Sequence, residues 1–403
     1  MLYERPVLRA VTVLLPFESS LSLFFSSTEM SRFRVVEHII PAHNYIPFDN
    51  PSPQEGDVTL IGAHACAFPK ELYEPLWDYI YDGMRGQNRS IRSIWIADVA
   101  QQGQSGVLNE SILGNDPSLY DHGRDLLSLL NYFKIPQPLI GVGHSMGGVQ
   151  LAHLSLMHPS LFTGLILIDP VIQPDNPSHR YALPSTYRRD IWPSRKEPPK
   201  NFENWIKFGL RDVPTKQYPI SQGTTSTAVT LTTPKAQELF TYLRPSYIDK
   251  RSGVRWGNPR DEMFPEDIDD IPFYRPEPSH IFRRIPELKP IVLYIFGGNS
   301  DISIPAARKE KMRTTGTGIG GSGGAACGKV QEVVLPCGHL VPMELPQESA
   351  KACTAFIDTA LSYWTSESVR FLEAWERIPN DELIRIDTQW EDNIGHLPKR
   401  PKL

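Results

Sequence analysis

Short, continuous apolar runs recur along the chain, with stretches of helical apolar spacing between them. Each run is typical of a strand that is buried on both faces, as in a parallel sheet covered by helices. Such strands are predicted at residues 58–63, 93–97, 139–142, 165–168, 290–296 and 330–335, after a first strand or hairpin within 33–46. Helices are predicted from residue 69 and at 118–133, 149–157, 305–312, 348–363 and 369–378. The alternation predicts an α/β fold, with a mostly parallel central sheet flanked by helices.

The pattern changes between residues 171 and 288, which are rich in proline and aromatic residues. Short helices are predicted there at 201–210 and 234–249. Ligands of open α/β sheets bind at the carboxyl ends of the strands, and long insertions at that edge are usually functional. We therefore expect a large helical lid inserted between two strands; the alternative is a structural excursion with its own small core.

These changes in pattern divide the chain into five expected parts. They are an N-terminal extension (1–30), a first part of the core (31–170), the lid (171–288), a second part of the core (289–390) and a polar tail (391–403). Residues 7–25 partly resemble a secretory signal, but Pro16 and Glu18 interrupt the apolar stretch, which is too broken for a membrane span. A cleaner start follows at Met30. We expect residues 1–29 to be loosely attached or to lie upstream of the true start.

Composition narrows the class of protein. The 403 residues are 40% hydrophobic and 22% charged, as in a globular protein, and the net charge of −5 gives no sign of a nucleic-acid partner. The four cysteines are scattered and show no metal-type spacing, so we expect free thiols in a reducing compartment and neither a metal nor another cofactor. They are Cys66, Cys327, Cys337 and Cys353.

The candidate chemistry centres on the run at 139–142, which ends in Gly143-x-Ser145-x-Gly147 ahead of a helical segment. This strand, sharp turn and helix are the context of a nucleophile elbow. A Cβ at position 143 or 147 would clash with nearby backbone, which explains the glycines. The turn would expose the Ser145 hydroxyl and direct the Met146 N–H toward its target. A plain glycine-rich turn is the alternative.

A serine nucleophile needs a base and a carboxylate that orients the base, and in this type of fold they follow the serine in the order acid, then histidine. His339 comes directly after the last predicted strand, where the base belongs, and the other histidines are worse placed. Two acids satisfy the order. Asp169 ends the strand after the elbow helix, and Asp301 follows the next strand. Spacing alone leaves both open, each with a structural alternative as a strand-end or turn residue.

An oxyanion hole needs two backbone N–H donors. Met146 is one candidate, and Ala65 or Cys66, in the loop after the strand at 58–63, is the other. Cys66 itself is a weak candidate for a nucleophile, because no histidine is placed to activate its thiol.

These pieces resemble the α/β-hydrolase superfamily across residues 33–378. The runs at 143–148, 154–162 and 165–172, with residues 31–41 and the tail, are similar to fungal peroxisomal hydrolases of secondary-metabolite and toxin clusters, a group that includes mycophenolyl-CoA hydrolases and hydrolases of AK-toxin and AF-toxin biosynthesis. The resemblance implies that the acid is Asp169, which lies 24 residues after Ser145, although Asp301 has the position that most of the wider superfamily uses. It also suggests a homodimer.

The chain ends in Pro401-Lys402-Leu403, a variant of the small–basic–Leu signal for import into peroxisomes. A disordered basic end is the alternative. Together with the free cysteines and the resemblance, this tail predicts binding to the peroxisomal import receptor and a location in the peroxisomal matrix.

The sequence thus predicts a serine hydrolase that cleaves an acyl-CoA thioester or an ester of a polyketide-like or fatty-acid-like chain in fungal toxin or secondary-metabolite biosynthesis. CoA would be a leaving group and not a cofactor. One alternative is a general lipase or carboxylesterase. Another is a non-catalytic binding protein of the same fold, which the complete set of serine, acid and histidine disfavours.

Overall fold

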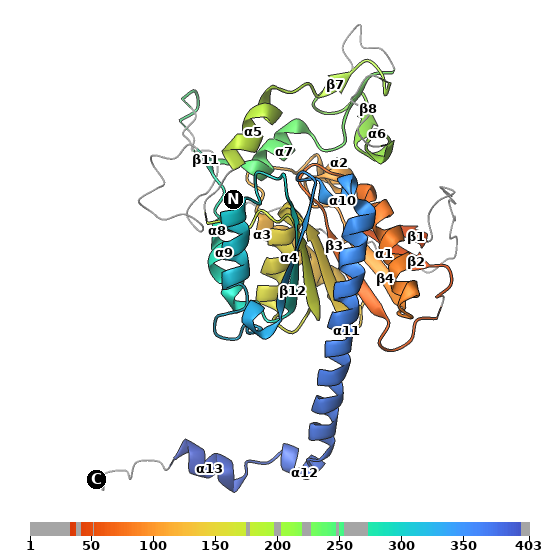
Figure 1. Cartoon of the computed structure of the whole chain (residues 1–403). Coiled ribbons are helices and arrows are strands. Elements are labelled where there is room, and N and C mark those ends of the chain that lie inside the picture. The colour runs from red at the N-terminus through yellow and green to blue at the C-terminus, as the bar shows by residue number, and fades with distance from the viewer. Residues whose placement is uncertain are drawn as a thin grey trace, which may run out of the picture. The chain divides into compact units, whose positions relative to one another are not determined.

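An eight-stranded sheet forms the centre of the protein (Figure 1). The structure, a computed structural model, describes residues 33–37, 42–50, 52–174, 178–196, 203–219, 227–246, 250–253 and 273–395. The strand order is β1-β2-β4-β3-β5-β6-β12-β13. The strands are β1 (Phe33–Glu37), β2 (Ala42–Pro47), β3 (Val58–Ala63), β4 (Ile91–Ala97), β5 (Leu139–His144), β6 (Gly164–Ile168), β12 (Ile291–Gly297) and β13 (Val330–Leu335). Because β2 pairs antiparallel with β1 and β4 and the other pairs are parallel, the predicted mostly parallel sheet is confirmed.

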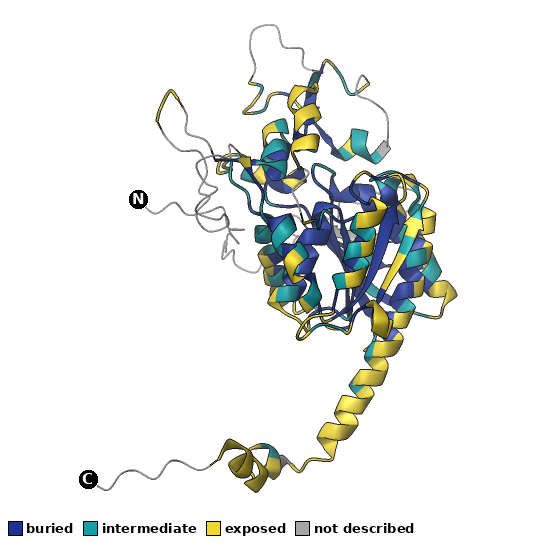
Figure 2. Cartoon of the chain, turned by 60° about the vertical axis from the view of Figure 1, so that its left-hand side comes forward, coloured by how far each residue is buried: buried dark blue, intermediate teal, exposed yellow. Residues whose placement is uncertain are grey.

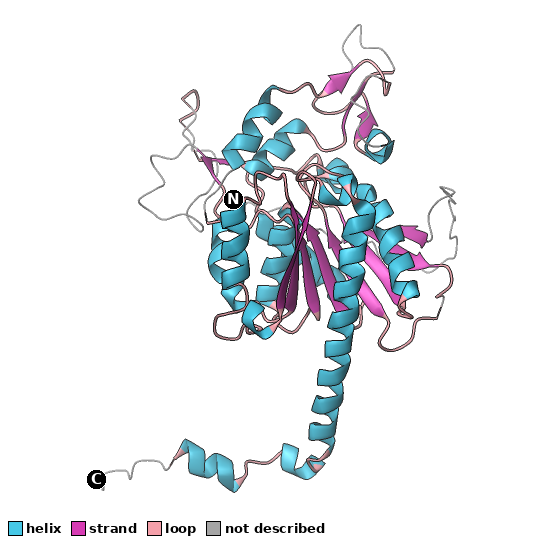
Figure 3. Cartoon of the chain, viewed as in Figure 1, coloured by secondary structure: helices cyan, strands magenta, loops and turns pink. Residues whose placement is uncertain are grey.

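Helices cover both faces of this sheet (Figure 3). One layer contains α3 (Leu119–Tyr132), α4 (Met146–Met157), α8 (Glu277–Arg284) and α9 (Pro305–Thr314). The other contains α1 (Glu74–Gly86) and the first part of α11 (Pro346–Glu376). These two helices pack closely, since a Cβ at Gly83 would lie 2.6 Å from the Thr354 side chain. Ser118 caps α3 in a capping box with Asp121, which fixes the start of that helix.

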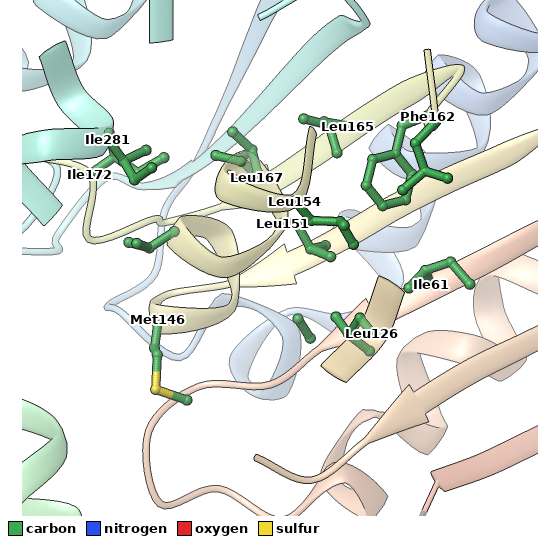
Figure 4. Close-up of a cluster of buried hydrophobic side chains, with 14 of the residues drawn as sticks. Ile61, Leu126, Met146, Leu151, Leu154, Phe162, Leu165, Leu167, Ile172 and Ile281 are labelled. Atoms are coloured by element: carbon green, nitrogen blue, oxygen red, sulfur yellow. The ribbon is translucent and has the colours of Figure 1, made fainter. Parts of the chain in front are cut away.

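The core explains why α4 is held rigidly. Apolar side chains surround it from the sheet, from α3 and from α8 (Figure 4). The cluster contains Leu151 and Leu154 of α4 itself, together with Ile61, Leu126, Phe162, Leu165, Leu167 and Ile281, all buried. Fully burying one such side chain is worth about 1.5–3 kcal/mol relative to exposure. Figure 2 shows the same arrangement, with dark blue strands beneath helices that are exposed on their outer sides. A nucleophile at the start of α4 is therefore held in place by the packing of this helix.

Two helices differ from the sequence prediction. Helix α2 (Gly103–Asn109) is not among the helices that the sequence predicts; the Gln102 carbonyl accepts from Gly106 N–H at 2.8 Å. The two helices expected at 348–363 and 369–378 are one continuous helix, α11, because residues 364–368 contain no glycine or proline to end it.

The insertion between β6 and β12 contains strands as well as helices. Its helices are α5 (Ser178–Tyr187), α6 (Glu203–Phe208), α7 (Lys235–Tyr242) and α8. Three short strands form a separate sheet, in the order β7 (Ile191–Trp192), β9 (Val229–Leu231), β8 (Leu210–Asp212), and β10 (Arg244–Pro245) pairs with β11 (Phe273–Tyr274). The insertion contains the expected helices, and β-branched and aromatic residues here also pair as short strands over a small core of their own. Its role as a lid stays a prediction. Helix α7 ends at Tyr242, before the strand that holds Pro245.

Contacts group the chain into two compact units, residues 1–360 and 361–403. The second unit contains the end of α11, α12 (Asn380–Leu383) and α13 (Thr388–Ile394). The predicted extension at 1–30 and the terminal Pro401-Lys402-Leu403 lie outside the described residues. Among the described helices, none combines the length and the apolar character that crossing a bilayer requires. The division into five parts stays a prediction.

Candidate active site

Ser145 lies in a strained turn between β5 and α4. Its φ of 56° and ψ of −113° are rare for a residue with a side chain. A Cβ at Gly143 would lie 2.6 Å from the Gly147 carbonyl oxygen, and one at Gly147 would lie 2.1 Å from the Ala63 carbonyl oxygen. Only glycine fits at either position, as the motif predicts. The Ser145 N–H donates to the Ile168 carbonyl at 2.9 Å, which ties the turn to the neighbouring strand.

The structure brings Ser145, His339 and Asp169 together at the carboxyl ends of three strands. Ser145 Oγ and His339 Nε2 are 2.8 Å apart, and His339 Nδ1 and Asp169 Oδ2 are 2.7 Å apart. Ser145 follows β5, Asp169 follows β6, and His339 follows β13. With the proton on Nδ1, the ring donates to the carboxylate and its Nε2 can accept the serine proton. This is the arrangement that activates a serine in acyl-transfer enzymes.

Asp301 has a different partner. Its carboxylate is exposed and accepts a hydrogen bond from Tyr181, a residue of the insertion, at 3.0 Å. Of the two acids that the chain order leaves open, the structure therefore places Asp169 and not Asp301 against the His339 ring.

Asp169 is buried and has several donors in addition to His339. Gly297 N–H donates to it at 3.1 Å, Ser300 Oγ lies 2.5 Å from Oδ2, and Ser303 donates to Oδ1. Burial alone would raise the pKa of the Asp169 carboxyl, but the bonds from His339, Ser300 and Ser303 lower it below its usual value. The carboxylate is therefore ionised and held in one orientation. Sequence reasoning missed both serines, although their position just after an apolar strand was an available signal.

Two backbone N–H groups are candidate donors to an oxyanion at the site, one at the start of α4 and one in the loop after β3. Helix α4 begins at Met146, so the Met146 N–H has no partner within the helix. The Ala65 N–H, in contrast, already donates to the Tyr73 hydroxyl at 2.8 Å. Among the described residues, no acceptor is bonded to the Cys66 N–H. Of the two residues that the sequence suggests, Cys66 is therefore the one whose N–H is available.

His64 fixes the direction of that N–H. Val99 N–H donates to His64 Nε2 at 3.0 Å, so Nδ1 carries the proton and donates to the Ala65 carbonyl at 2.8 Å. In a trans peptide the carbonyl and the following N–H point in opposite directions. Holding the Ala65 carbonyl therefore also sets the orientation of the Cys66 N–H.

The Cys66 thiol has the character of a buried apolar group. Burial raises the pKa of the thiol well above its usual value. Its sulfur lies 3.5 Å from Gln102 Nε2 and 3.8 Å from the Glu238 carbonyl oxygen. None of these contacts is a base that could form a thiolate.

A mainly apolar pocket lies beside Ser145. Core and insertion both contribute to its wall: Ala65, Phe68, Leu119, Met146, Ile302 and His339 come from the core, and Val171, Tyr181, Tyr242 and Pro278 from the insertion. Because the insertion supplies part of the wall, its residues help to decide which groups fit next to the nucleophile.

A buried ion pair fastens the insertion to the core beside this pocket. Arg275 donates to Glu277 at 2.8 Å and to the Pro117 carbonyl at 3.0 Å. Glu277 accepts from the Leu119 N–H at the start of α3, at 3.0 Å. Burial alone would raise the pKa of Glu277, but the neighbouring arginines lower it to about 2. No pattern in the sequence indicates this network, because its members are scattered along the chain.

Comparisons with known proteins agree with this architecture. A family model described as alpha/beta hydrolase family matches residues 75–352. The type I acyl-CoA thioesterase mpaH' of Penicillium brevicompactum is 37% identical over 93% of this chain and 98% of its own length. The abhydrolase domain-containing protein AFT2-1 of Alternaria alternata is 31% identical over 55% of this chain and 84% of its own. The structure of the peroxisomal alpha-beta-hydrolase Lpx1 from Saccharomyces cerevisiae aligns with a TM-score of 0.57 at 17% identity, covering 85% of this chain and 91% of that one. This last likeness concerns the fold.

Proposed function

The chain belongs to the alpha/beta hydrolase family and is a hydrolase, and we propose that it cleaves an acyl-CoA thioester. In this proposal Ser145 is the nucleophile, His339 is the general base and acid, and Asp169 orients His339. The observation that carries the proposal is the unbroken pair of hydrogen bonds, 2.8 Å from Ser145 to His339 and 2.7 Å from His339 to Asp169.

The first half of the reaction forms an acyl-enzyme. His339 Nε2 takes the Ser145 proton while Oγ attacks the carbonyl carbon, and the carbonyl π electrons move to its oxygen. The N–H groups of Met146 and Cys66 donate to that oxyanion. When the tetrahedral intermediate collapses, the C–S bond breaks and the CoA sulfur takes the proton from His339.

The second half restores the serine. His339 takes a proton from water, which attacks the ester carbon of the acyl-enzyme, and the same two N–H groups stabilise the second oxyanion. Collapse breaks the C–Oγ bond, Ser145 regains its proton from His339, and the carboxylic acid leaves. Ionised Asp169 stabilises the imidazolium in both halves.

The choice of acyl-CoA rests on the relatives. Two proteins that share 37–38% identity with most of this chain are named type I acyl-CoA thioesterases. The apolar lining of the pocket suits an apolar acyl group, and we propose a polyketide-like or fatty-acid-like chain. We place the reaction in fungal secondary metabolism, with toxin biosynthesis as the narrower proposal. An ester substrate, as for a lipase or carboxylesterase, would use the same residues.

A matched pair of substrates tests the leaving group. We expect a long-chain acyl-CoA to be hydrolysed with a higher kcat/KM than the p-nitrophenyl ester of the same acid, and Ser145→Ala to abolish both activities. Turnover of the ester alone would contradict the thioesterase proposal. Failure of a fluorophosphonate probe to label Ser145 would favour the non-catalytic binding protein instead.

We propose the peroxisomal matrix as the location, because Pro401-Lys402-Leu403 resembles a peroxisomal import signal. A fluorescent protein joined to the N-terminus of the full chain should coincide with a peroxisomal marker. Removing residues 401–403 should leave it in the cytosol, and an unchanged distribution would contradict the proposal.

A homodimer is proposed on the resemblance alone. Light scattering after size-exclusion chromatography should give twice the chain mass of 45.6 kDa. A mass of one chain across the working concentrations would contradict it.

A further inference from the structure

A line of three hydrogen bonds joins the loop after β3 to the backbone of His339. We call this loop the oxyanion loop, because it holds the proposed donor Cys66. The Ala65 N–H donates to the Tyr73 hydroxyl oxygen at 2.8 Å. The same hydroxyl lies 2.8 Å from His144 Nδ1, and His144 Nε2 lies 2.8 Å from the His339 carbonyl oxygen. Ala65 precedes the proposed donor Cys66, and His144 precedes Ser145. The line therefore includes the residues that precede Cys66 and Ser145, and the backbone of His339 itself.

The direction of each bond follows from the chemistry of its ends. The His339 carbonyl can only accept, so His144 Nε2 carries the ring proton and donates. Burial lowers the pKa of His144 to about 3, so the ring is neutral and its Nδ1 is an acceptor. The Tyr73 O–H then donates to Nδ1, and its oxygen lone pairs accept from Ala65. We assign this single orientation because any other would leave two donors or two acceptors facing each other.

Both side chains are almost completely buried, with 2% of Tyr73 and 1% of His144 exposed. Neither lines the pocket beside Ser145. Water therefore cannot easily replace a lost member of the line, and neither side chain is placed to contact the acyl chain. Their effect on the reaction would have to pass through the groups they hold.

We propose that Tyr73 and His144 are positioning residues that hold the oxyanion loop and the His339 loop in register with each other. The inference rests on the proposed function, because it concerns how the same site is aligned. A shift of either loop would move the Cys66 N–H or the His339 ring relative to Ser145, so the pair fixes both distances at once. Positioning errors of this kind lower the rate of the chemical step and leave ground-state binding almost unchanged.

Single and double substitutions test the pair. Removing one oxyanion donor outright costs about 10²–10³-fold in kcat, so we expect a smaller loss, about 10–100-fold, for Tyr73→Phe and for His144→Leu, with KM changed less than about twofold. The double variant should lose no more than about threefold beyond the worse single variant, because either change already breaks the line. His144→Gln, whose amide can both accept and donate, should recover part of the loss. Unchanged kcat in Tyr73→Phe, a loss confined to KM, or fully multiplicative losses would overturn the proposal.

Tyr294→Phe is the matched control. Tyr294 is as deeply buried, and its hydroxyl bonds to Thr315 Oγ1 at 2.8 Å, away from the line. We expect its kcat per folded molecule to stay within about twofold of the wild type. If Tyr294→Phe loses as much as Tyr73→Phe, the effect is general to buried hydroxyls and the proposal fails.

A second measurement separates this inference from the choice of substrate. The rate at which a fluorophosphonate labels Ser145 depends on the serine, His339 and the oxyanion hole, but not on a thioester. We expect the labelling rate to fall in parallel with kcat in Tyr73→Phe and His144→Leu. If the wild type is labelled but cleaves no acyl-CoA, the thioesterase proposal fails and the labelling rates still decide the role of the pair. If Ser145→Ala is labelled as fast as the wild type, the nucleophile assignment fails, and the pair with it.

Discussion

Tyr181 donates a hydrogen bond to the Asp301 carboxylate, with 3.0 Å between the two oxygens. Tyr181 belongs to helix α5 of the insertion and lines the pocket beside Ser145, whereas Asp301 belongs to the loop after β12. Asp301 therefore contacts the insertion, and the His339 ring bonds to Asp169 instead. Two carboxylates that look equivalent in the sequence have separate roles in the folded protein.

This difference predicts opposite results for two matched substitutions. Asp169→Asn should lower kcat/KM for an acyl-CoA by about 10³–10⁴-fold, because an amide cannot hold the His339 ring in the required tautomer or stabilise its charge. Asp301→Asn keeps an oxygen that can accept from Tyr181, so it should stay within about threefold of the wild type. Steady-state kinetics of both variants measure this. A large loss in Asp301→Asn and a small one in Asp169→Asn would reverse the assignment.

The glycine after the nucleophile is predicted to be irreplaceable. In Gly147→Ala the new methyl group would lie 2.1 Å from the Ala63 carbonyl oxygen, which belongs to a central strand. Overpacking typically costs about 1–3 kcal/mol, and here it would also shift the elbow. We expect a lower urea midpoint and a loss of at least about 100-fold in kcat.

Gly86→Ala is its control. No atom lies within 4 Å of a Cβ at this last residue of α1, and alanine favours helix by about 0.8–1.0 kcal/mol over glycine. We expect equal or higher stability and normal activity. Wild-type behaviour of Gly147→Ala would show that the elbow tolerates the contact and that our reading of the turn is wrong.

Replacing the Cys66 side chain should leave the reaction intact. Its proposed contribution is the backbone N–H, which Cys66→Ala retains, so kcat should change less than about fivefold. Because burial raises the pKa of the thiol, iodoacetamide should modify Cys66 slowly in the folded protein at pH 7. Peptide mapping by mass spectrometry measures the modification. A loss of activity in Cys66→Ala comparable to that of Ser145→Ala would point to a thiol nucleophile.

Buried neutral histidines predict that the protein loses stability in mild acid. Burial lowers the pKa of His122 from 6.5 to about 3. Between these values the unfolded chain binds a proton that the folded protein does not, so the free energy of unfolding falls as the pH is lowered from about 6.5 toward 3. Each such group contributes up to about 1.4 kcal/mol per pH unit. Urea unfolding at pH 7, 6 and 5 should show this slope.

His122→Gln should lower that slope by up to about 1.4 kcal/mol per pH unit, the contribution of one group, because the amide does not titrate. Among the described residues, neither ring nitrogen of His122 has a hydrogen-bond partner, so no specific bond is lost in the exchange. An unaltered slope in His122→Gln would mean that His122 binds protons equally in the folded and unfolded states, which contradicts the prediction.

Sequence patterns were most informative where one stretch of residues must satisfy both its own backbone conformation and its burial in the fold. Runs such as 139–142 and 165–168 could be assigned to strands because a strand buried on both faces is continuously apolar. Ser145 and His339 could be found because a strained elbow requires glycines at fixed spacing, and because chain order limits where the base can come from. The parallel strands then bring both residues to one edge of the sheet.

What the sequence could not show depends on contacts between distant segments. Chain order left Asp169 and Asp301 open, since only their hydrogen-bond partners in the folded protein separate them. Ala65 and Cys66 looked equivalent as donors until Tyr73 was placed against the Ala65 N–H. The short strands of the insertion have two or three residues each, too few for a periodic pattern.

The insertion leaves the sheet after β6 and returns at β12, two strands that pair directly in parallel, with Ile168 opposite Ile295. Its two ends therefore lie on neighbouring strands, and the proposed nucleophile, acid and base, which are Ser145, Asp169 and His339, all lie outside residues 171–288. During evolution such a segment can lengthen, shorten or be exchanged between paralogues, because both of its ends join neighbouring strands of the same sheet. Descendants of one ancestral catalyst could thus acquire new acyl preferences by recombination here, without rebuilding the machinery that breaks the bond.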